Sequence, residues 1–61
     1  MRFIRRLRRL EREAREEAQT LRRRHGGAAI LAAREKLRRP DLTSWGRRVL
    51  RRAIKMLKTE L

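Results

Sequence analysis

The sequence predicts an all-α protein, a small three-helix bundle formed by a single domain over residues 1–61. Apolar residues recur every three or four positions in the first and last thirds of the chain, which is the spacing of one face of an α-helix. Two breaker clusters, Gly26-Gly27 and Pro40, divide the chain into three stretches. No stretch alternates apolar and polar residues as a β-strand does, so we expect helices over roughly 2–25, 28–39 and 44–60.

The first predicted helix, over residues 2–25, carries a narrow apolar seam. At about 100° per residue the seam spans an arc of about 80°, which suits packing against one neighbouring helix. Its members are Phe3, Leu7, Leu10, Ala14, Ala18 and Leu21. Gly26-Gly27 ends the helix, because glycine accepts the left-handed backbone of a helix cap. On the polar side, Glu11 and Arg15 are expected to pair across one helical turn.

The second predicted helix, over residues 28–39, begins with six apolar residues and then becomes charged. Ile30, Ala33 and Leu37 share a face that we expect to be buried, whereas Leu31 points elsewhere and needs a contact of its own. Pro40 ends the helix, because the residue before a proline is disfavoured in helical geometry. The short connections on either side, of about two and about four residues, predict roughly antiparallel neighbours.

The third predicted helix, over residues 44–60, separates apolar from basic side chains completely. Thr43 is the expected N-cap, and we interpret Gly46 as room for the close approach of another backbone. The apolar arc covers about 180°, enough to touch both other helices, or one of them and a second chain. Five residues of this arc are expected to anchor the core or a partner: Trp45, Val49, Leu50, Ile54 and Leu57.

Composition excludes several classes of function. The chain has no cysteine and one histidine, so it offers no disulfide framework, thiolate site or histidine cluster. No nucleophile stands at a telling distance from a base, and we expect no enzyme activity, no metal and no cofactor. The longest apolar run is six residues, whereas a membrane span needs about 20. Residues 1–10 lack the apolar stretch of a secretory signal, and we expect a cytoplasmic protein, in a nucleoid-associated, phage or mobile-element setting.

The charge predicts nucleic acid as the partner. Twenty Lys+Arg against seven Asp+Glu give a formal net charge of +13. Arginine supplies most of it, and its planar guanidinium makes two parallel hydrogen bonds to a phosphate or a guanine edge. Two sets of residues are expected to bind nucleic acid: Arg47, Arg48, Arg51, Arg52, Lys55 and Lys58 on the third helix, and Arg22, Arg23 and Arg24 at the end of the first. The basic face of the third helix lacks Asn, Gln and Ser, so we expect mainly phosphate contacts, with double-stranded DNA ahead of RNA.

Other partners stay open at the level of sequence. A small helical adaptor or inhibitor would dock the apolar face of the third helix on an acidic partner protein, and a homo-oligomer would use the same face. Membrane-surface binding ranks lower, because the first helix has a narrow apolar arc and four glutamates in its middle. The short loops would also suit a designed bundle. We expect the folded monomer to be only marginally stable. So small a domain buries little surface, and at a net charge of +13 its basic residues repel one another.

Overall fold

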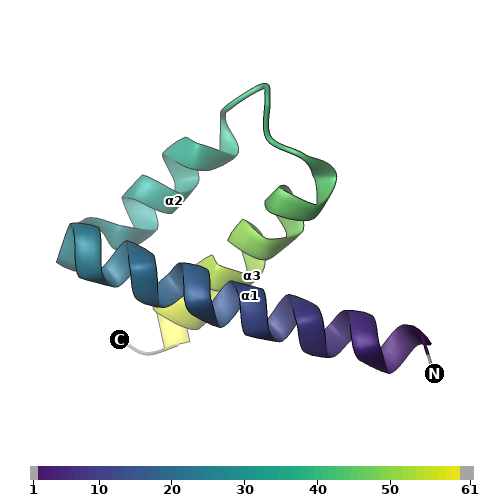
Figure 1. The fold of residues 1–61 in the computed structure, drawn as a ribbon. Coiled ribbons are helices and arrows are strands. Elements are labelled where there is room, and N and C mark those ends of the chain that lie inside the picture. Colours follow the sequence, from purple (N-terminus) through teal and green to yellow (C-terminus); the bar gives the residue numbers. More distant parts are fainter. Residues whose placement is uncertain (1, 60–61) are drawn as a thin grey trace.

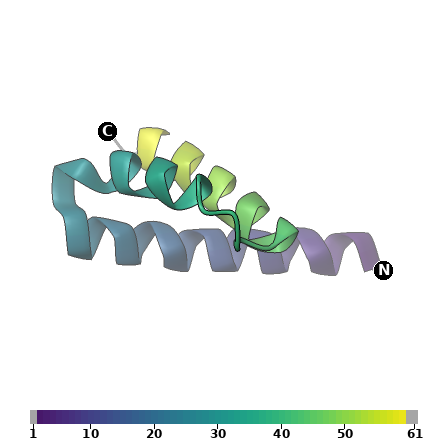
Figure 2. The same cartoon turned by 90° about the horizontal axis from the view of Figure 1, so that it is seen from above.

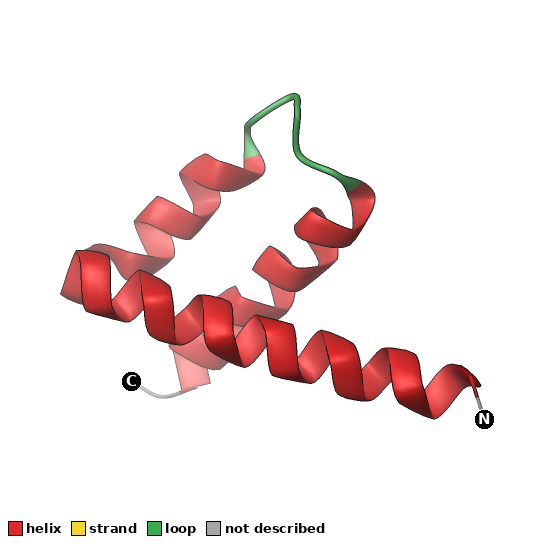
Figure 3. Cartoon of the chain, viewed as in Figure 1, coloured by secondary structure: helices red, strands yellow, loops and turns green. Residues whose placement is uncertain are grey.

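All regular secondary structure over residues 2–59 is helical in the computed structural model, which confirms the all-α prediction (Figure 3). The structure describes the backbone of residues 2–59 and the side chains of residues 4–59. The elements are α1 (Arg2–His25), the 3-10 turn η1 (Gly26–Ala28), α2 (Ala29–Leu37) and α3 (Ser44–Thr59). The side chain of Phe3 and the expected helix end at residue 60 lie outside the described residues.

The junction at Gly26 is a helical turn and not a loop. Gly26 has a φ of +54°, the left-handed conformation expected of a capping glycine. Three residues of 3-10 helix then lead straight into α2. The helical residues therefore form two uninterrupted stretches, 2–37 and 44–59. The predicted division into three separate helices is wrong at this junction, because the chain turns within the 3-10 segment and no loop residue separates α1 from α2.

The helix α2 ends two residues before the predicted boundary at residue 39. The amides of Arg38 and Arg39 donate to carbonyl oxygens three residues earlier, at 3.1 and 3.2 Å. Such bonds tighten the last turn of a helix. Pro40 follows directly and prevents residue 39 from continuing the α-helix.

The predicted faces of α2 are confirmed except at one position. Ala33 is buried, and Ile30 and Leu37 pack partly buried against the core. Leu31 is 62% exposed and finds no contact of its own, contrary to the prediction. Leu31 therefore lies on the side of α2 that faces away from the core.

Thr43 caps α3 as predicted. Its hydroxyl accepts a hydrogen bond from the amide of Gly46 at 2.9 Å, which satisfies a donor of the first turn. The atoms nearest to Gly46 belong to side chains and not to another backbone. A Cβ at this position would lie 3.0 Å from Leu42 Cδ1 and 3.1 Å from Thr43 Oγ1. The glycine therefore makes room for side chains of the connecting loop, and our interpretation of it as a helix-packing glycine is wrong.

The helices lie in two layers. One layer is α1, and the other is the antiparallel pair α2 and α3, as the two views show (Figures 1 and 2). The helix α3 packs against both α1 and α2, which confirms that its wide apolar arc contacts both. The Cα extents are 37 × 28 × 15 Å, so the molecule is thin in one direction. The first turns of α1 extend past the other two helices towards the N-terminus (Figures 1 and 2).

The core between the layers is built largely from small side chains. Ten apolar residues of the part that the structure describes are buried, and five of them are alanines: Ala14, Ala18, Ala29, Ala33 and Ala53. Among the described residues, Leu21 and Leu57 are the only large side chains with less than 2% exposure. Alanine lets two helices approach closely, but each one removes little apolar area from water.

Candidate nucleic-acid interface

The apolar face of α3 is buried within the chain itself. Four of the five predicted anchors are at most 9% exposed: Val49, Leu50, Ile54 and Leu57. Trp45 is partly buried at the start of the helix. Because α1 and α2 cover this face, a partner would reach it only if one of those helices moved away.

The six cations predicted to form the basic face of α3 divide into two that are engaged within the chain and four that are not. Arg47 belongs to the first group. Its Nη1 donates to the carbonyl oxygen of Leu37 at 2.9 Å, and its Nη2 donates to the carbonyl oxygen of Arg39 at 3.3 Å. These oxygens lie at the end of α2, where backbone acceptors lack partners in the helix. Arg47 thus ties α3 to the end of α2.

Arg52 is the second engaged cation. Its Nε lies 2.5 Å from Oε1 of Glu11, and this ion pair joins α3 to α1. Both side chains keep partial exposure, so the pair orients the two helices more than it stabilises them.

The other four cations form a row along the outer side of α3. They are spaced three or four residues apart, which places them on one face over about 15 Å of helix. All are exposed, and none makes a hydrogen bond or ion pair with a residue that the structure describes. We call this row the α3 cationic stripe: Arg48, Arg51, Lys55 and Lys58.

Arginines of α1 extend the stripe at its N-terminal end. Arg6 and Arg9 line an open hollow of about 550 Å³ together with Arg48. Trp45 and the hydroxyl-bearing residues Thr43 and Ser44 complete its wall. The sequence gives no reason to add Arg6 or Arg9 to the predicted site, because it does not show which helix lies beside the start of α3.

The three arginines at the end of α1 do not join the stripe as a group. Arg22 lines a shallow hollow with Met56 and Thr59, in the last turns of α3. Arg23 donates to the hydroxyl of Thr20 on its own helix at 3.4 Å. Arg24 is exposed on the last turn of α1. Of this predicted set, the structure places Arg22 against α3.

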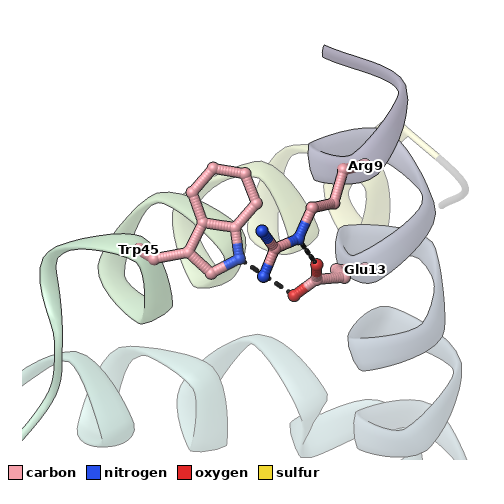
Figure 4. Close-up of polar contacts among 3 residues, drawn as sticks. All are labelled: Arg9, Glu13 and Trp45. Carbon is pink, nitrogen blue, oxygen red and sulfur yellow. Dashed lines mark hydrogen bonds and ion pairs between the residues drawn. The ribbon is translucent and has the colours of Figure 1, made fainter. Parts of the chain in front are cut away.

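Three glutamates of α1 join the two layers, a role that the sequence did not reveal. Besides the pair with Glu11, Lys36 Nζ of α2 lies 3.0 Å from Oε1 of Glu17. Glu13 contacts the start of α3, where the indole Nε1 of Trp45 donates to its Oε1 at 2.9 Å (Figure 4). The sequence holds one indication of this role: Glu13 and Glu17 lie one turn apart along the border of the apolar seam, where a neighbouring helix comes within reach.

The predicted pairing of Glu11 with Arg15 is wrong. Glu11 reaches across to Arg52 of α3 instead. The pair within α1 is Arg9 with Glu13, whose Nε and Oε2 atoms lie 2.5 Å apart. A local pair of exposed side chains is worth only a few tenths of a kcal/mol, so a cation from another helix readily displaces it.

The contacts around Glu13 lower its pKa. The hydrogen bond from Trp45 is the largest cause, and the bond from Arg9 is the second. Both favour the charged carboxylate over the neutral acid. Arg9 also lies over the Trp45 ring, with its Cζ 4.7 Å from the ring centroid, so the three side chains form one cluster (Figure 4).

The described residues contain no cluster of three or more His, Asp or Glu side chains that would hold a metal ion. Within the same part of the chain, no helix has both the length and the apolar character needed to cross a membrane. Comparison with protein families, curated proteins and solved structures finds no match to this chain, so its function is argued from its own surface.

Proposed function

We propose that the chain binds nucleic acid electrostatically, and double-stranded DNA in particular, through the α3 cationic stripe. The observation that carries this proposal is the row of four exposed cations that no carboxylate among the described residues neutralises. A row of fixed positive charges about 15 Å long matches a repeating phosphate backbone better than a single small anion. Arg6 in the adjoining hollow would lengthen the contact.

The chemistry of the stripe favours phosphate contacts over base readout. Arginine binds a phosphate through two hydrogen bonds, and lysine binds it as a point charge. A helix about 10–12 Å wide fits the major groove, which is about 12 Å wide. Between its first and last residues α3 offers no Asn, Gln, Ser or Thr. We therefore expect tight contact with the backbone and weak sequence preference.

The placement of the acidic residues supports the same proposal. The helix α3 carries six basic residues and no Asp or Glu between Ser44 and Thr59. Three of the glutamates of α1 contact Lys36, Arg52 or Trp45 between the layers, and none of them forms an ion pair with a cation of the stripe. A net charge of +13 would steer the chain towards polyanions and speed its association with them. The expected setting is a DNA-containing compartment, such as the cytoplasm around a nucleoid.

The test is a titration of fluorescently labelled duplex DNA, followed by anisotropy at several salt concentrations. Neutralising at least four phosphates predicts a slope of log K against log salt of about −4 or steeper. Binding that is absent, or that does not respond to salt, would contradict the proposal and leave the adaptor alternative ahead.

A matched pair of variants separates a defined site from diffuse attraction. Arg48→Gln/Arg51→Gln/Lys55→Gln removes three charges from the stripe. Its control, Arg24→Gln/Arg34→Gln/Arg38→Gln, removes three exposed charges from α1, α2 and the turn after α2. The stripe variant should lose at least tenfold in affinity, and its salt slope should become shallower by about 3. The control should lose only a few-fold, through long-range charge. Equal losses would mean that no site exists.

A further inference from the structure

The N-terminal turns of α1 leave an apolar strip uncovered. Ile4 and Leu7 are 47% and 49% exposed, whereas Leu10 is partly buried and Ala14 is fully buried. At helical spacing these residues follow one side of α1. The ribbon of α1 extends past α3 towards the N-terminus, so this side continues beyond the part that α3 covers (Figures 1 and 2). We call the segment from Ile4 to Arg9 the α1 overhang.

Arginines occupy the rest of the circumference of the overhang. At about 100° per residue, the apolar positions 4, 7 and 10 cover an arc of about 120°, and positions 5, 6, 8 and 9 fall outside it. The overhang has no acidic residue. The nearest carboxylate on the same side is Glu11, which pairs with Arg52. Glu11 lines the same hollow as Ile4 and Leu7, together with Arg8, Arg12 and Arg15, so the surroundings of the strip remain mainly basic. A short apolar arc with a basic surround is typical of a helix that lies on an anionic surface.

The charge disfavours pairing of the overhang with the overhang of a second copy. Residues 1–10 carry five arginines and no acid, so two overhangs would bring like charges together. A protein groove that binds a helix contacts about four of its apolar side chains, over two turns or more. The overhang offers two exposed aliphatic side chains, Ile4 and Leu7, before α3 covers the seam. Shallow insertion of two side chains below charged headgroups suits a bilayer surface.

We propose that the α1 overhang binds the surface of an anionic phospholipid bilayer. Ile4 and Leu7 insert into the boundary between headgroups and acyl chains, while Arg5 and Arg8 contact the phosphates. The glutamates that argue against membrane binding of the whole first helix begin at residue 11, after the overhang, and three of them contact α2 or α3. Ile4 and Leu7 do not line the hollow that Arg6 and Arg9 form with Arg48, so the apolar contact proposed here does not depend on DNA binding.

The test is flotation of the full chain with phosphatidylcholine vesicles that contain or lack phosphatidylglycerol. The wild type should bind only the anionic vesicles. Leu7→Ser should lower the affinity several-fold, and Ile4→Ser/Leu7→Ser about tenfold. Leu31→Ser is the matched control, because it removes a leucine from α2 that is even more exposed than Leu7, at 62% against 49%, and should bind like the wild type. Circular dichroism and duplex affinity should be unchanged in all three variants, which separates this surface from the stripe.

Several outcomes would overturn the proposal. Equal binding by Leu7→Ser and Leu31→Ser would mean that charge alone, or general apolarity, attracts the chain to lipid. Failure of the wild type to bind anionic vesicles would exclude the bilayer as the occupant. A concentration-dependent dimer that Leu7→Ser abolishes, seen by sedimentation, would assign the strip to a second copy. Loss of DNA binding in the stripe variant, with vesicle binding retained, would instead support the proposal, because it would show that the two surfaces act independently.

Discussion

At the scale of single residues, the cluster of Trp45, Glu13 and Arg9 shows how a very basic chain uses its few acids. The carboxylate of Glu13 accepts hydrogen bonds from both neighbours, and the guanidinium of Arg9 lies over the indole ring. The cluster fixes the start of α3 against α1. Trp45 is therefore a structural contact between helices, and it also lines the open hollow beside Arg6, Arg9 and Arg48.

The cluster predicts an acid-sensitive stability that depends on Glu13. Its pKa is lowered in the fold from the ordinary value of 4.5, mainly by the bond from Trp45. The contact therefore stabilises the protein above pH 4.5, and this stabilisation is lost as the pH falls through the lower folded-state pKa. Thermal melts between neutral pH and pH 3 should show a larger fall for the wild type than for Glu13→Gln.

Glu16 provides the control for that experiment. It lies on the same helix, is exposed, and makes no hydrogen bond or ion pair with a described residue. Glu16→Gln should keep the wild-type acid sensitivity. If it behaves like Glu13→Gln, the sensitivity reflects the general loss of negative charge and not the cluster.

Gly26 predicts a cost for any side chain at the turn between α1 and α2. Its φ of +54° disfavours residues with a Cβ, although nothing lies within 4 Å of the Cβ position. Gly26→Ala should lower the free energy of unfolding by about 1–2 kcal/mol, measured by chemical denaturation. Gly27 is equally open but has no such φ, so Gly27→Ala should be neutral or slightly stabilising. Equal effects of the two substitutions would contradict this explanation.

At the scale of elements, the sequence defines each helix better than it defines the neighbours of that helix. The cap at Thr43, the apolar arc of α3 and the glycine at the end of α1 are local features, and the structure confirms them. The sequence predicts a loop at Gly26-Gly27 where the structure has a 3-10 turn, because a pair of glycines is compatible with both.

Because the sequence does not show the neighbours of a helix, it also does not show that the six cations of α3 divide into two that are engaged within the chain and four that are not. On a helical wheel, Arg47 and Arg52 lie at the two edges of the basic arc, next to Ile54 and Trp45. Side chains at such edges lie where the neighbouring helices come within reach. Periodicity alone does not say which neighbour is there, so all six cations appeared equivalent. The structure leaves the central four outward and engages the two at the edges.

This split predicts opposite behaviour for Arg47 and Arg51. Arg47→Ala removes two hydrogen bonds to the end of α2 and should lower the free energy of unfolding by about 1–2 kcal/mol. Arg51→Ala should change stability by less than about 0.5 kcal/mol. Duplex affinity should respond in the opposite sense, with the larger loss for Arg51→Ala. Denaturation and anisotropy on the same two proteins measure both effects, and parallel losses would show that Arg47 also faces the ligand.

At the scale of the whole molecule, a thin alanine-rich core holds together a chain of net charge +13. Half of the buried apolar residues are alanines, and the smallest Cα extent is 15 Å. Each alanine contributes little hydrophobic stabilisation, while the charge favours expansion. Three ion pairs among the described residues offset a small part of the repulsion. The folded state should therefore depend on whatever screens or neutralises its charge.

Added salt should raise the melting temperature. Screening weakens the ion pairs, but the repulsion among 20 basic residues is the larger effect. Between about 20 mM and about 500 mM sodium chloride, where the screening length falls severalfold, we expect an increase of several degrees by circular dichroism. Sodium phosphate and duplex DNA should raise it further, since they bind the folded state. A melting temperature that falls with salt would mean that the ion pairs dominate.

The measurement that tests the account most directly is a nuclear magnetic resonance titration of the isotopically labelled chain with a short DNA duplex at moderate salt. The account predicts that shift changes concentrate on Arg48, Arg51, Lys55 and Lys58, extend to Arg6, and leave Arg34 on α2 and Arg38 in the turn after it unchanged. Changes spread evenly over every arginine would contradict it, as would changes centred on the buried apolar face of α3.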